Sequence, residues 1–114
     1  MKSIINILVF LFITNSLVAQ AFKDEISVVQ FSAPFTKASE ISLKKFNDHN
    51  TYTFLINEKK SVFDNEKIKY LPTIVLYHNG EEIIRIESGI SLKLPENTIK
   101  LIEEQIEEII ESKF

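Results

Sequence analysis

Residues 70–80 read YLPTIVLYHNG, and the fold can be derived outward from this stretch. Pro72 stops any helix before it, and residues 73–77 form a short run of β-branched and apolar side chains that predicts a strand. Asn79-Gly80 predicts a tight hairpin turn, because both residues tolerate a positive φ angle. The chain is therefore expected to return as a second strand over residues 82–87.

Two further strands are expected upstream of this hairpin. Residues 26–31 and 51–56 are short runs rich in β-branched and aromatic side chains, and the second run is apolar enough to lie centrally in a sheet. Between them, residues 35–48 space their apolar side chains as a helix does, and His49-Asn50 is expected to end that helix. The short charged stretch 61–70 predicts one or two further helical turns.

The longest predicted helix runs from Pro95 to Ser112. One of its faces consists of isoleucines: Ile99, Ile102, Ile106, Ile109 and Ile110. The opposite face consists of glutamates: Glu103, Glu104, Glu107, Glu108 and Glu111. Like charges four residues apart weaken a helix, so the isoleucine face must dock on the sheet. The glutamates are expected to face water rather than to bind a cation, and the stripe covers too few heptads for a coiled coil.

These elements follow the order β-α-β-α-β-β-α. A strand, a helix and a strand at the start imply a right-handed parallel crossover, and the hairpin adds antiparallel strands to the same sheet. The sequence therefore predicts an α/β fold with a central, mixed four-stranded sheet and helices on both faces.

Residues 1–21 are expected to be a signal peptide that does not belong to the fold. A lysine near the start precedes an apolar run over residues 4–13, and Ala19 and Ala21 form the small-x-small pattern that signal peptidases cut. Cleavage after Ala19 or Ala21 would leave one domain, residues 22–114, in the periplasm or outside the cell. The alternative is an uncleaved membrane anchor, which the short apolar run disfavours.

The composition excludes several classes of function. The chain has 114 residues, two glycines, no cysteine and a net charge of −3. Without cysteine it can have no disulfide, no thiolate nucleophile and no cysteine-ligated metal. Two glycines are too few for a phosphate-binding loop, and the negative charge disfavours nucleic acid. His49 and His78 lack a second ligand at the spacing of a zinc site, so no metal or other cofactor is expected.

Three stretches together resemble the thioredoxin family. Residues 28–35, VVQFSAPF, are similar to the strand that leads into the active site of that family. Residues 70–73, YLPT, are similar to its hydrophobic-Pro-Thr motif, which contains a cis proline. Residues 79–81, NGE, and then Gly89 are similar to its hairpin turn and following glycine. The resemblance covers essentially all of residues 22–114 and implies a thioredoxin-like fold.

The reactive motif of that family is missing from this chain. Where the family has Cys-x-x-Cys, the sequence has Thr36, Lys37, Ala38 and Ser39. A hydroxyl can neither attack a disulfide nor resolve a mixed disulfide. Gln30 stands where the family often has a buried acid, and residues 51–56 lack the lysine that commonly accompanies it. The sequence therefore predicts a member of the family without thiol–disulfide exchange.

The resemblance also implies a binding groove beside the proline. In the family, the residue before the cis proline pairs with an extended peptide, in the manner of strand addition. On this chain the groove would be outlined by Phe35, Thr36, Leu71, Pro72 and Gly89. The alternative is that Pro72 only ends a helix and shapes the start of the next strand.

Thr36 and Ser39 invite a second interpretation as nucleophiles. A hydroxyl nucleophile needs a base within reach, usually histidine. The fold is not expected to bring His49 or His78 close to Thr36, so capping of a helix is the simpler role for both hydroxyls.

The expected function is the binding of an extended peptide or a partner protein by an exported, monomeric, redox-inactive domain. One alternative is an enzyme: the thiol–disulfide oxidoreductase that the family label would suggest, or an activity on peroxide or glutathione. Another alternative is a structural subunit of the cell envelope that docks through the acidic helix. No nucleic-acid partner and no stable membrane span after cleavage of the signal peptide are expected.

Overall fold

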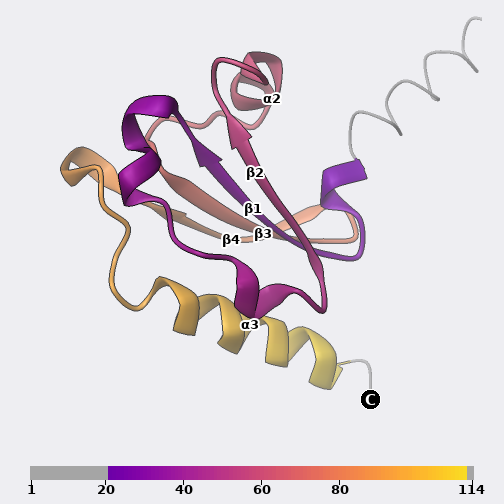
Figure 1. Ribbon diagram of the computed structural model, residues 1–114. Helices are drawn as coiled ribbons and strands as arrows, with labels where there is room; N and C mark the ends of the chain where they lie inside the picture. Colours follow the sequence, from indigo (N-terminus) through magenta and orange to yellow (C-terminus); the bar gives the residue numbers. More distant parts are fainter. Residues whose placement is uncertain (1–20, 113–114) are drawn as a thin grey trace, which may run out of the picture.

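The computed structural model of the chain describes residues 21–112, which form a mixed four-stranded sheet with helices on both faces (Figure 1). The strands lie in the order β2-β1-β3-β4 and are β1 (Ile26–Ser32), β2 (Asn50–Leu55), β3 (Thr73–His78) and β4 (Glu81–Glu87). β1 and β2 are parallel, whereas β3 is antiparallel to both β1 and β4. Residues 1–20 of the expected signal peptide lie outside the described residues.

The sheet has an apolar cluster on each face, because successive side chains of a strand point to opposite sides. On one face, α3 (Thr98–Ser112) packs against the sheet, and the buried residues are Ile26, Val28, Phe46, Ile74, Leu76, Ile86, Ile102, Ile106 and Ile109. On the other face, α2 (Lys60–Asn65) and the short 3-10 turn η1 (Ala21–Lys23) cover an aromatic cluster of Phe22, Val29, Phe31, Phe63, Val75 and Tyr77. The predicted order of the four strands is confirmed, and so is the docking of Ile102, Ile106 and Ile109 on the sheet. Ile110, expected on the same face, is 40% exposed, and α3 begins at Thr98 rather than Pro95.

The helix predicted over residues 35–48 is wrong. The structure has two short 3-10 segments in its place, η2 (Pro34–Ser39) and η3 (Lys44–Phe46). Glu40 leaves helical geometry with a ψ angle of 145°, so the helical turn of η2 stops there and does not continue into η3.

A contact with the sheet explains why this stretch is not one helix. Gln30 in the middle of β1 is 1% exposed. Its Oε1 atom accepts a hydrogen bond from the backbone N–H of Ile41 at 2.9 Å, and its Nε2 atom donates to the carbonyl of Ile41 at 3.0 Å. Both backbone groups of Ile41 are therefore bound by a side chain, and they are not available to a continuous helix.

The second strand also differs from its prediction, because β2 lies at an edge of the sheet and not in its centre. Its apolar character comes from Tyr52 and Phe54, which pack against the aromatic cluster on one face, whereas Thr53 is exposed. The helix predicted over residues 61–70 is shorter as well. α2 ends at Asn65, and Lys67 adopts a left-handed conformation with a φ angle of 56°.

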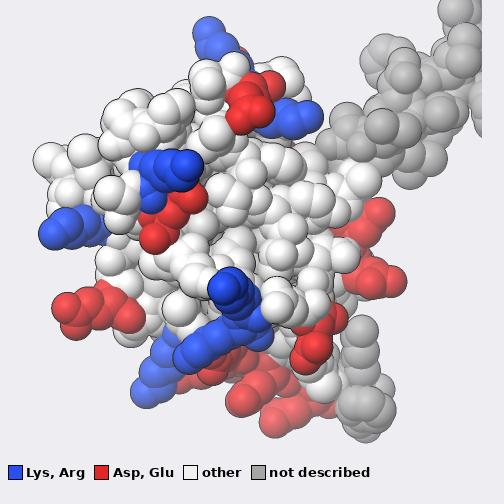
Figure 2. All heavy atoms as spheres, viewed as in Figure 1, with Lys and Arg blue, Asp and Glu red and all other residues white. Residues whose placement is uncertain are grey.

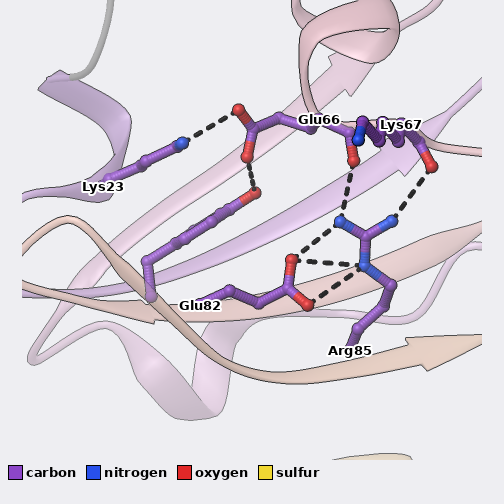
Figure 3. A network of polar contacts seen from close by, with 6 residues as sticks. Lys23, Glu66, Lys67, Glu82 and Arg85 are labelled. Carbon is purple, nitrogen blue, oxygen red and sulfur yellow. Dashed lines mark hydrogen bonds and ion pairs between the residues drawn. The ribbon is translucent and has the colours of Figure 1, made fainter.

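A network of polar contacts joins η1, α2 and β4 (Figure 3). Lys23 Nζ lies 2.9 Å from Glu66 Oε2, and the hydroxyl of Tyr77 donates to Glu66 Oε1 at 2.7 Å. Arg85 donates through Nη2 to the backbone carbonyl of Glu66 at 2.7 Å and forms an ion pair with Glu82, also at 2.7 Å. The guanidinium therefore satisfies a carbonyl at the C-terminal end of α2, which a helix alone leaves without a partner.

The network also perturbs the acidity of its members. Burial raises the pKa of the Tyr77 hydroxyl above its ordinary value, and the hydrogen bond to Glu66 raises it further. The hydrogen bond to Glu82 raises the pKa of Arg85 above its ordinary value. Tyr77 therefore remains a neutral hydrogen-bond donor toward the Glu66 carboxylate over a wide range of pH.

Candidate functional site

Three segments meet at one end of the sheet. η2 follows the carboxyl end of β1, Pro72 precedes β3, and the 3-10 turn η4 (Gly89–Ser91) follows β4. The register pairs Thr73 with Phe31 on one side and with Glu87 on the other. The topology therefore brings the residues expected to form a groove from separate parts of the chain to the same end of the sheet (Figure 1).

The proline at this end is fixed by the backbone around it. The Leu71–Pro72 peptide bond is cis, Pro72 is buried, and Leu71 is half-buried against the aromatic cluster. The backbone N–H of Ser88 donates to the carbonyl of Pro72 at 3.2 Å. The hydroxyl of Thr73 donates to the carbonyl of Tyr70 at 2.6 Å. Gly89, next to Ser88, is half-buried.

The hydroxyl of Thr36 is buried and engaged in hydrogen bonds. Thr36 is 2% exposed, and its Oγ1 atom accepts a hydrogen bond from the N–H of Ala33 at 3.0 Å. The same oxygen lies 3.1 Å from Ser32 Oγ, and Ser32 Oγ donates to Glu40 Oε2 at 2.8 Å. Thr36 therefore satisfies the backbone where η2 begins, which agrees with a capping role for its hydroxyl.

The other positions of the degenerate motif do not meet a catalytic base. They are exposed or half-buried: Lys37, Ala38 and Ser39. His78 pairs with Ile26 at the opposite end of β1, about 20 Å from η2 by the rise of a strand. His49 directly precedes β2 at that same opposite end. A hydroxyl nucleophile at Thr36 therefore has neither histidine within hydrogen-bonding reach.

Large apolar side chains are exposed at the η2 and η4 end of the sheet. Phe35 is 73% exposed and Ile90 is 95% exposed, and Tyr70 and Leu92 are also open to solvent. We call Phe35, Tyr70, Ile90 and Leu92 the apolar rim. Only Phe35 was among the expected groove residues. The sequence carries no signal for the exposure of the others, whereas in the structure exposed apolar side chains of this size typically mark an interaction site.

Two features of the described residues bear on other functions. Within residues 21–112, no group of three or more histidine, aspartate or glutamate side chains is arranged to hold a metal ion. No helix in this part of the chain is long and apolar enough to cross a membrane.

Comparisons with known proteins place the fold. No protein-family model matches the sequence, and neither does a curated protein. Among solved structures, the chain is similar to a thioredoxin from Malassezia sympodialis, with a TM-score of 0.58 and 18% identity over 80% of this chain and 84% of that one. A mutant thioredoxin from Entamoeba histolytica gives a TM-score of 0.56 and 19% identity over 80% of this chain and 91% of the other. The fold is thioredoxin-like.

A third match agrees with this assignment. A mutant thioredoxin from Halobacterium salinarum has a TM-score of 0.56 and 17% identity over 76% of this chain and 80% of its own. Identities this low establish the fold and not the activity. The thioredoxin-like domain described here has no cysteine anywhere in its sequence, so the two sulfurs on which thiol–disulfide exchange depends are missing. The predicted thioredoxin-like fold is confirmed.

Proposed function

We propose that the protein is an exported, redox-inactive thioredoxin-like domain that binds an extended peptide or an extended segment of a partner protein. The binding site is the end of the sheet where η2, the Leu71–Pro72 bond and η4 meet. The observation that supports this proposal is the apolar rim, where Phe35 and Ile90 are 73% and 95% exposed.

The rim and the backbone beside it can serve different parts of such a peptide. An extended peptide can hydrogen-bond to backbone groups as an added strand does, and Leu71 provides such groups next to the end of β3. Apolar side chains of the peptide would then cover Phe35 and Ile90. Removing a large apolar side chain from water stabilises a complex by about 1.5–3 kcal/mol, so two such contacts contribute about 3–6 kcal/mol of the roughly 8 kcal/mol that micromolar binding requires.

Aspartate substitutions in the rim are expected to weaken peptide binding without unfolding the protein. In the double variant Phe35→Asp with Ile90→Asp, affinity for apolar peptides selected on an array is expected to fall by about tenfold or more. Ile110→Asp on α3, where Ile110 is 40% exposed, is the matched control and should leave affinity unchanged. The measurement is an NMR titration of the purified protein, followed at the backbone amides of Leu71 and Gly89. Unperturbed amides at these two positions would remove the proposal.

The redox-inactive part of the proposal has a separate test. The purified protein is expected to show no turnover in an insulin-reduction assay, because no thiolate is present to attack the disulfide. The double variant Thr36→Cys with Ser39→Cys is expected to show weak but measurable exchange, whereas Thr36→Cys alone, which lacks a resolving thiol, should not turn over. Turnover by the unmodified protein would contradict the assignment.

Export is tested by N-terminal sequencing of the protein recovered from the cell envelope or the medium. The pattern of residues 4–21 supports a chain that starts at Gln20 or Phe22 after cleavage. Phe22 is 8% exposed and part of the aromatic cluster, so the folded domain begins close to either site. Recovery of the protein from membranes with Met1 still in place would instead support the anchor.

A further inference from the structure

The two edge strands of the sheet differ in how they are protected from other strands. β4 carries Glu81, Glu82, Arg85 and Glu87, and charged side chains on an edge strand discourage pairing with another chain. β2, with the sequence NTYTFL, has no charged residue, no proline and no glycine. β2 therefore lacks the charged side chains and the proline that keep many edge strands from pairing.

The backbone groups of β2 that point away from the sheet belong to Thr51, Thr53 and Leu55, and the carbonyl of Leu55 already accepts from the N–H of Lys59. The N–H of Ile56 donates to the carbonyl of Ser32 on β1 at 3.0 Å. Backbone groups of successive residues alternate in direction along a strand, so the even-numbered residues of β2 face β1 and the odd-numbered ones face outward. Among the described residues, the N–H and C=O groups of Thr51 and Thr53 have no backbone partner.

We propose that this edge pairs with the same edge of a second copy of the chain, in an antiparallel arrangement with a twofold axis at Tyr52. Thr51 of one copy then lies opposite Thr53 of the other, and each such pair exchanges both of its N–H···O hydrogen bonds. Tyr52 lies opposite Tyr52 of the second copy, and the two sheets become continuous. This register satisfies the outward-facing backbone groups of both threonines in each copy.

The charges at the two ends of β2 fit this arrangement. The Asn50 end is acidic: Asn50 Nδ2 donates to the backbone carbonyl of Asp24 at 3.1 Å, and Asp24, Glu25 and Asp48 are all exposed there. Tyr52 also lines a surface hollow together with Asp24 and Glu25. Figure 2 shows acidic side chains where β1 begins and an uncharged surface along β2.

The other end of β2 has the opposite sign. The N–H of Lys59 donates to the carbonyl of Leu55 at 2.9 Å, and Lys59 and Lys60 are exposed, with Glu58 as the one acidic residue among them. Antiparallel pairing therefore places the basic end of each copy against the acidic end of the other. Complementary charge of this kind favours one orientation of two partners over others.

This surface is separate from the apolar rim, so the inference does not depend on the proposed peptide site. It differs from the expectation of a monomer, which considered a coiled coil through the isoleucine stripe of α3 and not pairing through the sheet. The identity of the edge strand was not visible in the sequence, where residues 51–56 had been expected in the centre of the sheet.

Engineered cysteines test the register directly, because the chain has none of its own. Antiparallel neighbours without mutual hydrogen bonds have Cα atoms about 4.5 Å apart, within the range that a disulfide spans. Tyr52→Cys is therefore expected to cross-link two copies under mild oxidation. Thr53→Cys is the matched control. Thr53 lies opposite Thr51 of the second copy, so the two introduced cysteines are offset by two residues along the strands. The yield of cross-linked dimer should therefore be at least about fivefold lower than for Tyr52→Cys. Equal yields, or none from a folded Tyr52→Cys variant, would contradict the register.

Charge reversal at the two ends of β2 tests the orientation. The whole chain is expressed, and the association of the purified protein is measured by sedimentation. The unmodified protein is expected to form dimers at about 100 μM, and Lys59→Glu with Lys60→Glu should weaken association by about tenfold. Asp24→Lys with Glu25→Lys should do the same, and an equimolar mixture of the two variants should restore dimers. A monomer at that concentration would overturn the proposal, and so would a dimer whose dissociation constant is unchanged by both charge reversals. Binding of added peptide at β2 by a protein that stays monomeric would also overturn it.

Discussion

Replacing Gln30 by alanine is expected to lower the free energy of unfolding by about 3 kcal/mol, because the loss combines unmade hydrogen bonds and a cavity. Gln30 is 1% exposed, and its amide binds both the N–H and the C=O of Ile41. The alanine variant leaves these two backbone groups without their partner and leaves the volume of the side chain empty. Urea denaturation at neutral pH measures the effect.

The variant Gln30→Glu separates the hydrogen bonds from the packing, because glutamate has nearly the same shape. A neutral carboxyl can both donate to the carbonyl of Ile41 and accept from its N–H, whereas an ionised carboxylate can only accept. Burial raises the pKa of this carboxyl above its unfolded value of about 4.3. Its stability should therefore approach that of the unmodified protein below about pH 4 and decrease as the pH rises through the folded pKa. If the difference in the free energy of unfolding between Gln30→Glu and the unmodified protein does not change with pH, this account is contradicted.

Replacing Glu66 by alanine is expected to cost about 2–3 kcal/mol, because a buried donor and a partly buried cation both lose their acceptor. Tyr77 is 1% exposed and donates to Glu66 at 2.7 Å. The side chains of Lys23 and Glu66 are only 15% and 13% exposed. The substitution also releases η1 from α2, so the loss should appear as weaker protection of the amides of Phe22 and Lys23 from hydrogen exchange.

Tyr77→Phe is the matched control for this prediction. It removes the hydroxyl and leaves the pair of Lys23 and Glu66, so its cost should be about 1 kcal/mol, and the double variant should be less unstable than the sum. The raised pKa of Tyr77 adds a test at high pH. The folded protein holds the phenolic proton more tightly than the unfolded chain, so this stability is present below about pH 10 and is lost above it. Two outcomes would contradict this account: losses of stability that simply add in the double variant, or a Tyr77→Phe variant that loses as much stability at high pH as the unmodified protein.

The strands and the hairpin could be predicted because their signals are local. The run at residues 73–77 and the turn at Asn79-Gly80 need no knowledge of the rest of the chain. The helix over residues 35–48 could not be excluded in this way, because its apolar spacing was helical. What ends η2 is the side chain of Gln30, which lies in a strand 11 residues from Ile41 along the sequence. A local pattern does not contain such a contact.

The candidate site was predictable to a similar extent. The motif around Pro72 placed the expected groove residues at one end of the sheet, and the structure brings their segments together there. The exposure of Ile90 and Leu92 was not predictable, because an apolar residue in a turn can be either buried or open. The edge position of β2 was missed for a related reason: Tyr52 and Phe54 are apolar on one face only, which a short strand does not reveal.

The shape of η2 limits the chemistry that sulfur could have at this site. A cysteine is acidified when aligned peptide dipoles of a helix point their positive end at it, and the size of the effect depends on a regular helix behind the residue. η2 is a six-residue 3-10 segment that turns extended at Glu40. A thiol at position 36, where the side chain is buried, would therefore not have its pKa lowered below that of free cysteine, and it would react slowly at neutral pH. The site lacks the macrodipole as well as the sulfur, so two substitutions restore the nucleophile without the field that activates it.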